Sequence, residues 1–155
     1  MAAKLKTDKT IKTVAEDLLK VLQIEGSIEA TELEDATYRV DIETPESGLL
    51  IGFHGDTLAS FQLMLSLMVH KKLDEWVRIT VEVGDYRAKR EVQLRNMAES
   101  YAARVKATGE PQTLPYLSAA DRRIIHLYFQ DDKELESESV GEGENRRITI
   151  KPRAS

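Results

Sequence analysis

The chain has 155 residues and no cysteine, with a formal net charge of −5, 41% hydrophobic residues and 32% charged residues. This balance is typical of a globular protein rather than a disordered one, and the lack of cysteine excludes disulfides and thiolate metal sites. No apolar run is long enough to cross a bilayer and the N-terminus lacks the apolar core of a signal peptide, so we expect a cytoplasmic protein without a membrane span.

Charge is unevenly distributed along the chain. Residues 1–83 carry 9 basic and 15 acidic side chains, whereas residues 85–130 carry 8 basic and 5 acidic ones. Residues 131–144 are acidic again, with 1 basic and 7 acidic side chains. The total argues against a strongly cationic nucleic-acid binder. A local positive patch can still bind phosphates, with modest and salt-sensitive affinity.

The first half of the chain alternates between helical and strand periodicity. Its apolar residues recur every three to four positions in some segments and every second position in others, which distinguishes helices from half-buried strands. This pattern predicts a helix over 8–23 capped by Asp8, strands over 28–33 and 37–43, a short helical turn over 45–51, a helix over 56–70 and a strand over 76–83.

The segment between the short turn and the helix that follows it reads Gly52-Phe53-His54-Gly55. Glycines allow a tight turn and a close approach of backbone, and the N-terminus of a helix favours a phosphate. A Gly-x-x-Gly loop that opens a helix is how a KH domain clamps single-stranded nucleic acid. The same four residues also fit a helical corner without a ligand.

After Gly84 the pattern changes, and we expect a domain boundary there, with domains at 1–84 and 85–155. The second part begins with a long amphipathic segment, and Ser118 with Asp121 three residues on resembles a capping box. We predict a helix over 85–108, a short strand over 112–114, a helix over 119–130 and a hairpin of strands 134–140 and 145–151.

Two basic side chains of the second part share a helix face, because Arg122 and His126 are four residues apart. Arginine binds phosphate through a fixed fork of donors, and histidine can donate a hydrogen bond and stack on a base. The alternative is a structural pair that holds helix 119–130 against the sheet. Arg123 is a weaker candidate. Arg146 and Arg147, together with Lys151 and Arg153, extend the same basic surface or form a solvated strand edge.

The order of elements in the first part is that of a type II KH domain, and Arg122 to His126 matches the Arg-x-x-x-His signature of the R-three-H domain. The chain as a whole resembles the Jag (KhpB, SpoIIIJ-associated) family of bacterial RNA-binding proteins. The matching phrases are Gly48-Leu49-Leu50-Ile51-Gly52-x-x-Gly55-x-Thr57-Leu58, Asp85-Tyr86-Arg87, Arg122-Arg123-Ile124-Ile125-His126, and Glu138-Ser139-x-Gly141-Glu142-Gly143 followed by Arg146-Arg147. The resemblance implies an α+β fold, a type II KH domain followed by a small R-three-H α/β domain.

Two features depart from the family pattern. Members usually carry basic residues inside the glycine loop, where this chain has Phe53 and His54. Phe53 then either stacks on a base or packs on the neighbouring helix. Many members also have an extra small N-terminal domain, for which we expect no room in this chain.

The motifs of catalysis are missing from the sequence, which has no nucleophile elbow, no phosphate loop and no metal-ligand cluster. We therefore expect a non-enzymatic binder without cofactor or metal. The resemblance implies a single-stranded RNA partner, with single-stranded DNA left open, and pairing with a second small KH protein. It also implies a post-transcriptional regulator or RNA chaperone linked to cell division and envelope growth.

The rival hypothesis is a protein–protein interaction module with a degenerate KH loop, and the sequence sets no oligomeric state. The predicted nucleic-acid contacts are Gly52, Phe53, His54, Gly55, Arg122, Arg123, His126, Arg146 and Arg147.

Overall fold

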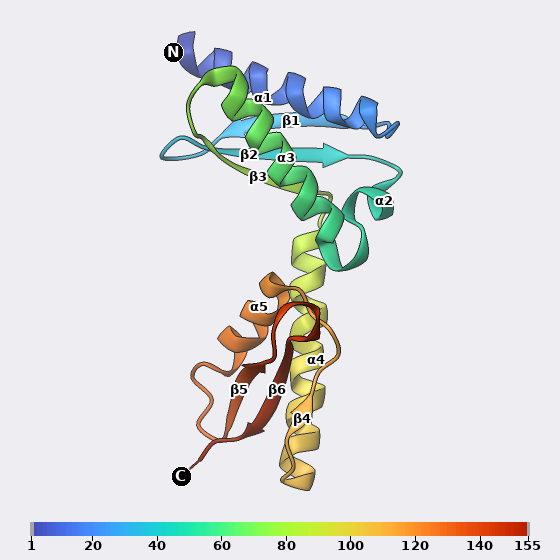
Figure 1. Cartoon of the computed structure of the whole chain (residues 1–155), viewed down its shortest axis with the longest axis vertical. Coiled ribbons are helices and arrows are strands. Elements are labelled where there is room, and N and C mark those ends of the chain that lie inside the picture. The colour runs from blue at the N-terminus through green and yellow to red at the C-terminus, as the bar shows by residue number, and fades with distance from the viewer. Residues whose placement is uncertain (1, 155) are drawn as a thin grey trace. The chain divides into compact units, whose positions relative to one another are not determined.

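A computed structural model describes the backbone of residues 2–154 and the side chains of residues 6–154. The chain divides into two compact units, Met1–Tyr86 and Arg87–Ser155, and Figure 1 labels their helices and strands. Among the described residues, no helix is both long enough and apolar enough to span a membrane.

The first unit contains two long helices, one short helix and three strands, in the predicted order. Its helices and strands are α1 (Ala2–Val21), β1 (Ser27–Glu32), β2 (Thr37–Glu43), α2 (Ser47–Ile51), the 3₁₀ turn η1 (Phe53–Gly55), α3 (Asp56–Leu73) and β3 (Arg78–Val83). The strand order is β1-β2-β3, in which β2 pairs antiparallel with β1 and parallel with β3.

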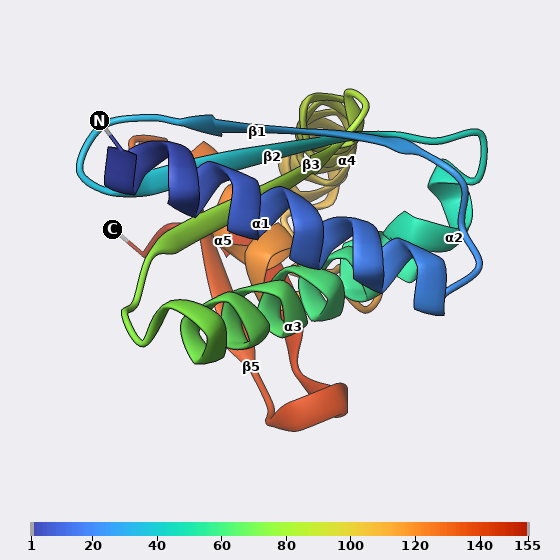
Figure 2. The same cartoon turned by 90° about the horizontal axis from the view of Figure 1, so that it is seen from above.

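Helices α1 and α3 cover one face of this sheet and lie side by side along it (Figure 2). The alternation of each strand sends its apolar side chains to that face, so that Tyr38, Val40 and Ile42 of β2 are buried while Arg39 and Glu43 are exposed. This is the pattern of a sheet with one face in the core and one face in water.

One expected feature of the first unit is wrong. Asp8 does not cap a helix, because α1 already begins at Ala2 and Asp8 lies inside it. The residues before Asp8 include alanine, lysine and leucine, which are strong helix formers and continue the helix past the position where a cap was expected.

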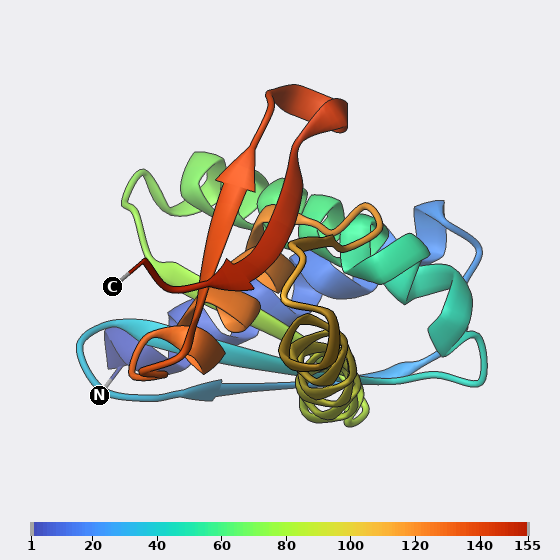
Figure 3. The same ribbon diagram turned by 90° about the horizontal axis from the view of Figure 1, so that it is seen from below.

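The second unit combines two helices with an antiparallel sheet (Figure 3). Its elements are α4 (Tyr86–Thr108, of which Tyr86 belongs to the first unit), β4 (Gln112–Thr113), α5 (Ala119–Phe129), β5 (Leu135–Val140), the 3₁₀ turn η2 (Gly143–Asn145) and β6 (Arg147–Pro152). The strand order is β4-β6-β5, with both pairs antiparallel. The core is shared by both helices and the sheet, as Leu94, Ile125, Phe129, Ile148 and Ile150 show.

The start of α5 is fixed by two interactions. The Ser118 side chain accepts a hydrogen bond from the Asp121 backbone N–H at 3.2 Å, as the capping pattern predicts. The Asp121 carboxylate forms an ion pair with Arg90 of α4, with 2.7 Å between Nη2 and Oδ2, and these side chains are only 12% and 5% exposed for Arg90 and Asp121. The α+β class is confirmed, and both units have their own core.

Candidate nucleic-acid interface

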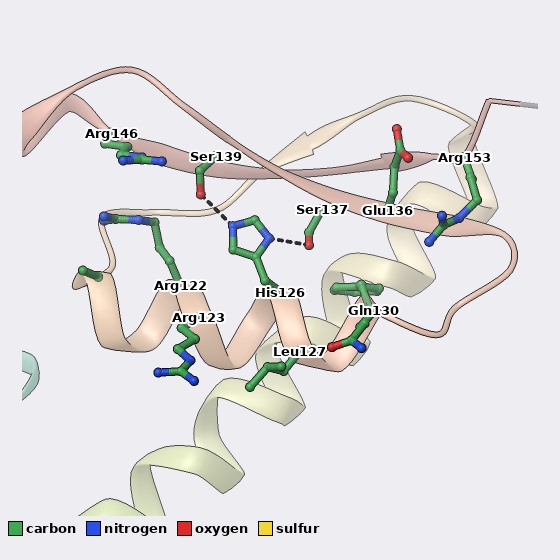
Figure 4. Close-up of a pocket in the computed structure, with 12 residues that line it drawn as sticks. Arg122, Arg123, His126, Leu127, Gln130, Glu136, Ser137, Ser139, Arg146 and Arg153 are labelled. Atoms are coloured by element: carbon green, nitrogen blue, oxygen red, sulfur yellow. Dashed lines mark hydrogen bonds between the residues drawn. The ribbon is translucent and has the colours of Figure 1, made fainter.

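Helix α5 presents a polar stripe beside its buried one. Ile125 and Phe129 pack into the core, whereas Arg122 and His126 lie one turn apart on a partly exposed face. That face is turned toward β5, whose alternation places Ser137 and Ser139 on the side of the sheet that meets the helix (Figure 4).

The imidazole of His126 is held between these two serines. Its Nδ1 lies 2.8 Å from Ser137 Oγ and its Nε2 lies 2.8 Å from Ser139 Oγ. Burial lowers the pKa of His126 below its ordinary value of 6.5, the positive charges of Arg122 and Arg146 lower it further, and an interaction with the Ser137 backbone opposes them. His126 is therefore neutral near pH 7, so that one ring nitrogen donates to a serine and the other accepts.

Arginines surround this histidine in a hollow of about 610 Å³. Figure 4 shows Arg122 and Arg146 at one end of the hollow, with Arg153, Gln130 and Glu136 at the other end. Nη1 of Arg122 donates a hydrogen bond to the Leu117 carbonyl oxygen at 2.6 Å, which fixes the guanidinium at the N-terminus of α5. The arrangement presents guanidinium groups at both ends of a neutral, hydrogen-bonded centre, with the Glu136 carboxylate at the same end as Arg153.

The two remaining arginines of the predicted set lie differently. Arg123 lines the edge of the hollow but projects from α5 away from His126 (Figure 4). Arg147 is folded back on its own turn, where Nη1 donates to the carbonyl oxygens of Glu144 at 2.6 Å and Arg146 at 3.1 Å. Its guanidinium also lies 5.5 Å from the centre of the Tyr116 ring. The structure therefore brings Arg122, His126 and Arg146 together and leaves Arg147 outside the hollow.

Two serines of the hollow escaped the sequence-based site prediction. Ser137 and Ser139 were not singled out, although small hydroxyl residues at alternate positions of a strand are a signal that one face meets polar groups. Arg153 joins the hollow from beyond β6. Lys151 does not contribute a free charge, because its Nζ lies 2.7 Å from Glu138 and 3.5 Å from Glu136.

The glycine loop of the first unit has a different character. It joins α2 to α3 through η1, and His54 adopts a left-handed conformation with φ 52°. No lysine or arginine occurs in the loop, and the first turn of α3 carries Asp56, which suits the helix dipole but repels phosphate. Any affinity of this loop for nucleic acid must come largely from something other than charge.

The two glycines of the loop are required by the packing of the chain itself. Gly52 has φ +71°, and a Cβ added there would overlap the Thr57 side chain. Gly55 has φ +85°, and a Cβ there would lie 3.1 Å from the ring of Tyr86. The sequence suggested that the glycines leave room for a sugar–phosphate backbone. The structure adds a reason that is independent of any ligand.

Phe53 is the most exposed feature of this loop. Its side chain is 66% exposed, and its ring stacks on that of His54 with 3.9 Å between centroids and 22° between planes. The ring is therefore not buried against the neighbouring helix, and stacking on a base stays a prediction. Leu50 and Leu58, at either end of the loop, are buried in the core.

The two surfaces present guanidinium donors, a hydrogen-bonded imidazole and an exposed aromatic ring. Proteins use all three kinds of group to hold nucleic acids. In the described part of the chain, no group of histidine, aspartate and glutamate side chains could hold a metal ion.

Both parts of the chain match models of known protein families. The family model described as "KhpA/KhpB, KH domain" matches residues 8–83, and that of the R-three-H domain matches residues 92–152. The RNA-binding protein KhpB of Clostridium symbiosum is 33% identical over 129 residues, which cover 83% of this chain and 58% of the relative. The RNA-binding protein KhpB of Bacillus subtilis is 31% identical over 116 residues, covering 74% of this chain and 56% of the relative.

The RNA-binding protein KhpB of Streptococcus pneumoniae serotype 2 is 28% identical over 156 aligned positions, covering 97% of this chain and 48% of the relative. This chain thus spans about half the length of the curated relatives that it matches. The two domain models occur in the order predicted, on the two units that carry the glycine loop and the Arg122–His126 pair. The chain belongs to the Jag/KhpB family, with a KH domain of the KhpA/KhpB type followed by an R-three-H domain.

Proposed function

We propose that this chain binds single-stranded RNA, with the hollow beside α5 as its phosphate-binding site. The observation that carries the proposal is the set of four arginines around the hollow, namely Arg122, Arg123, Arg146 and Arg153, with Glu136 as the acidic member. Guanidinium groups are the side chains best suited to phosphate oxygens, because their planar fork donates two hydrogen bonds at once.

The glycine loop contributes a second contact of another kind. Phe53 offers an exposed ring on which a base can stack, and its stacking on His54 holds it in place. Gly52, His54 and Gly55 shape the backbone that carries this ring. Two modest contacts on one chain raise the overall affinity wherever one strand reaches both.

The relatives support the same direction, because each is named an RNA-binding protein. We further propose, as the family resemblance implies, that the chain is a cytoplasmic post-transcriptional regulator or RNA chaperone linked to cell division and envelope growth. The family model is described for KhpA and KhpB together, which supports pairing with a second small KH protein. No enzymatic step is part of the proposal, and single-stranded DNA is the natural competitor ligand.

The test is fluorescence anisotropy with a labelled single-stranded RNA of about twelve nucleotides, long enough for such sites. Affinity should fall steeply between about 50 mM and about 200 mM salt, because each neutralised phosphate releases condensed counterions. Arg146→Gln should weaken binding about ten-fold, as expected for a lost charge-assisted hydrogen bond. Arg146 is the best probe because its exposed side chain forms no hydrogen bond or ion pair among the described residues.

Arg147→Gln is the matched control, since it removes the same charge one residue further along. Its guanidinium is engaged with Glu144 and Arg146 backbone oxygens outside the hollow, so affinity should change little. Equal losses in both variants would show that only the general charge of the strand edge matters. No binding at low salt would overturn the proposal.

A second candidate function is docking to another protein. The motivating observation is that Leu63, Met64 and Leu67 of α3 are 60%, 49% and 44% exposed, which leaves an apolar stripe on a helix of the KH domain. Failure to bind RNA at low salt, together with a partner whose binding is lost in Leu67→Lys, would favour this function over the first.

A further inference from the structure

A second hollow lies in the first unit, far from the glycine loop. The turn between β1 and β2 and the segment between α3 and β3 lie at the same end of the sheet (Figures 1 and 2). Together they line an open hollow of about 560 Å³, formed by Asp35, Ala36, Trp76, Val77 and Arg78. The glycine loop is at the opposite end of α3, a helix of 18 residues and therefore about 27 Å long.

Trp76 forms an aromatic wall of this hollow. Its side chain is 66% exposed, although tryptophan is usually well buried. One face of the indole is covered by the ring of His70, with 3.9 Å between centroids and 9° between planes. The near-parallel stack fixes the orientation of the indole. A tryptophan held flat and left in water is a platform for a second planar group.

The polar groups of the hollow come from the two other walls. Asp35 supplies a carboxylate and Arg78 a guanidinium, and neither side chain forms a hydrogen bond or ion pair with the rest of the described chain. Asp35 and Ala36 both adopt left-handed conformations, with φ 54° and 52°. Positive φ at both central residues is the conformation of a two-residue type I′ hairpin turn, and the Thr37 N–H closes this turn by donating a hydrogen bond to the Glu34 carbonyl oxygen at 3.2 Å. The Ala36 carbonyl oxygen accepts a hydrogen bond from the Arg78 backbone N–H at 3.3 Å, which joins the two walls.

We propose that this hollow binds a guanine base of a single strand, and the proposal rests on the RNA-binding function proposed above. Guanine presents donors, N1–H and the N2 amino group, next to the acceptors O6 and N7, and arginine is the usual partner of O6 and N7. The carboxylate of Asp35 accepts from the donors, Arg78 donates to the acceptors and Trp76 stacks on the ring. Adenine offers an acceptor at N1, which faces the carboxylate unfavourably, so the hollow distinguishes the two purines.

The charges around the hollow favour recognition of the base over recognition of phosphate. Glu34, Asp74 and Glu75 are exposed in the same two segments, with Lys71 and Lys72 in the last turn of α3. The acidic residues repel a phosphate placed beside Trp76, and affinity there comes from stacking and hydrogen bonds. A site of this kind depends weakly on salt. The competing occupant is a cationic side chain over the indole face.

The test uses intrinsic fluorescence, because Trp76 is the sole tryptophan of the chain. The probes are two oligouridine strands of equal length, one with a single central guanine and one with adenine in its place, followed in parallel by anisotropy. The guanine strand should quench Trp76 saturably and bind at least about five-fold more tightly than the adenine strand. Both purines stack on an indole, so this preference comes from the hydrogen bonds that only guanine makes. Trp76→Leu and Asp35→Asn should each abolish that preference. Asparagine tolerates the left-handed backbone at position 35 as aspartate does.

Each of the following results would overturn the guanine site. A strand that binds by anisotropy without changing Trp76 fluorescence, or a guanine preference that survives Asp35→Asn, overturns the guanine site and leaves the RNA-binding function intact. Quenching by an oligoarginine peptide but not by the guanine strand shows a cation site instead. If neither strand binds by anisotropy, the RNA-binding function fails and the guanine site fails with it.

Discussion

The hollow beside α5 and the glycine loop of α3 belong to one chain but present opposite kinds of side chain. The hollow is lined by four arginines around a histidine that two serines hold in place. The glycine loop has no cation, an acidic residue in the first turn of the following helix and an exposed phenylalanine. One surface suits phosphate, whereas the other suits a flat apolar ring.

The difference separates two physical contributions to the binding of a single strand. Contacts between arginine and phosphate weaken with salt because they release counterions, and they carry little sequence information. Stacking on an aromatic ring depends weakly on salt and needs an unpaired base. In this chain the two contributions are on different units, so substitutions can remove one without the other.

The largest effect is expected from breaking the buried ion pair between Arg90 and Asp121, which fixes the start of α5 beside the arginine hollow. Asp121→Asn leaves the Arg90 guanidinium buried, 12% exposed, without its carboxylate partner. Removal of one partner of a buried ion pair costs about 3–5 kcal/mol. Urea unfolding of the full chain, followed by circular dichroism, should show this loss of unfolding free energy in the second unit. Asp131→Asn is the control, since Asp131 is exposed and should change the stability by less than about 0.5 kcal/mol.

The frame of the glycine loop depends on backbone conformation instead of charge. Gly52→Ala places a Cβ against the Thr57 side chain at φ +71°, and we expect a loss of about 1–3 kcal/mol in unfolding free energy. Gly48→Ala is the matched control, because an added Cβ meets nothing within 4 Å at this position of α2. That variant should gain up to about 1 kcal/mol from helix propensity. Equal effects of the two substitutions would contradict this account of the loop.

Much of the fold could be predicted from sequence, because it depends on local periodicity. As the alternation predicts, Tyr38, Val40 and Ile42 are buried on one face of β2. As the four-residue spacing predicts, Arg122 and His126 lie one turn apart on α5. The beginning of α1 could not be fixed in this way. Asp8 is a good cap residue, but the preceding residues form helix equally well, and local preference does not choose between the two starts.

The candidate sites were harder to predict because they depend on contacts between distant segments. The residues around Ser137 and Ser139 do not indicate which side chain these serines contact. In the structure their hydroxyl oxygens lie 2.8 Å from the ring nitrogens of His126, which is eleven and thirteen residues earlier in the chain. The same holds for Gly55, whose Cβ position faces Tyr86. Arg146 and Arg147 look equivalent in sequence, yet only one lines the hollow, because the turn before β6 directs the two side chains differently.

Phe53→Leu tests the aromatic contact of the glycine loop, and its expected effect is smaller than those of Asp121→Asn and Gly52→Ala. Because glycine substitutions disturb the fold of the loop, this variant is the sharper probe of binding there. Phe53 is 66% exposed, so its loss should leave the stability unchanged. Affinity for single-stranded RNA should fall by about 1 kcal/mol, with no change in the slope of affinity against salt. A reduced salt slope would show that the loop orders a phosphate contact and that the two contributions are not separate.

The smallest effect is expected from the titration of His126. Since the folded chain holds the pKa of His126 below its ordinary value of 6.5, the unfolded chain binds a proton first as the pH falls. The stability that depends on neutral His126 is therefore fully present above pH 6.5 and is lost as the pH falls through the folded pKa. His126→Gln should unfold with a weaker dependence on pH between pH 7.5 and pH 5.5 than the native chain.

A bound strand should oppose this lowering of the His126 pKa. A phosphate seated between Arg122 and Arg146 neutralises the charges that disfavour the imidazolium ion and adds a negative charge of its own. The pKa of His126 should then rise on binding, and the chain should take up protons and bind RNA more tightly as the pH falls below about 6.5. The imidazole signals in nuclear magnetic resonance spectra, titrated with and without RNA, measure this directly. An unchanged His126 pKa in a saturated complex would place the phosphate elsewhere, and the aromatic loop would become the principal contact.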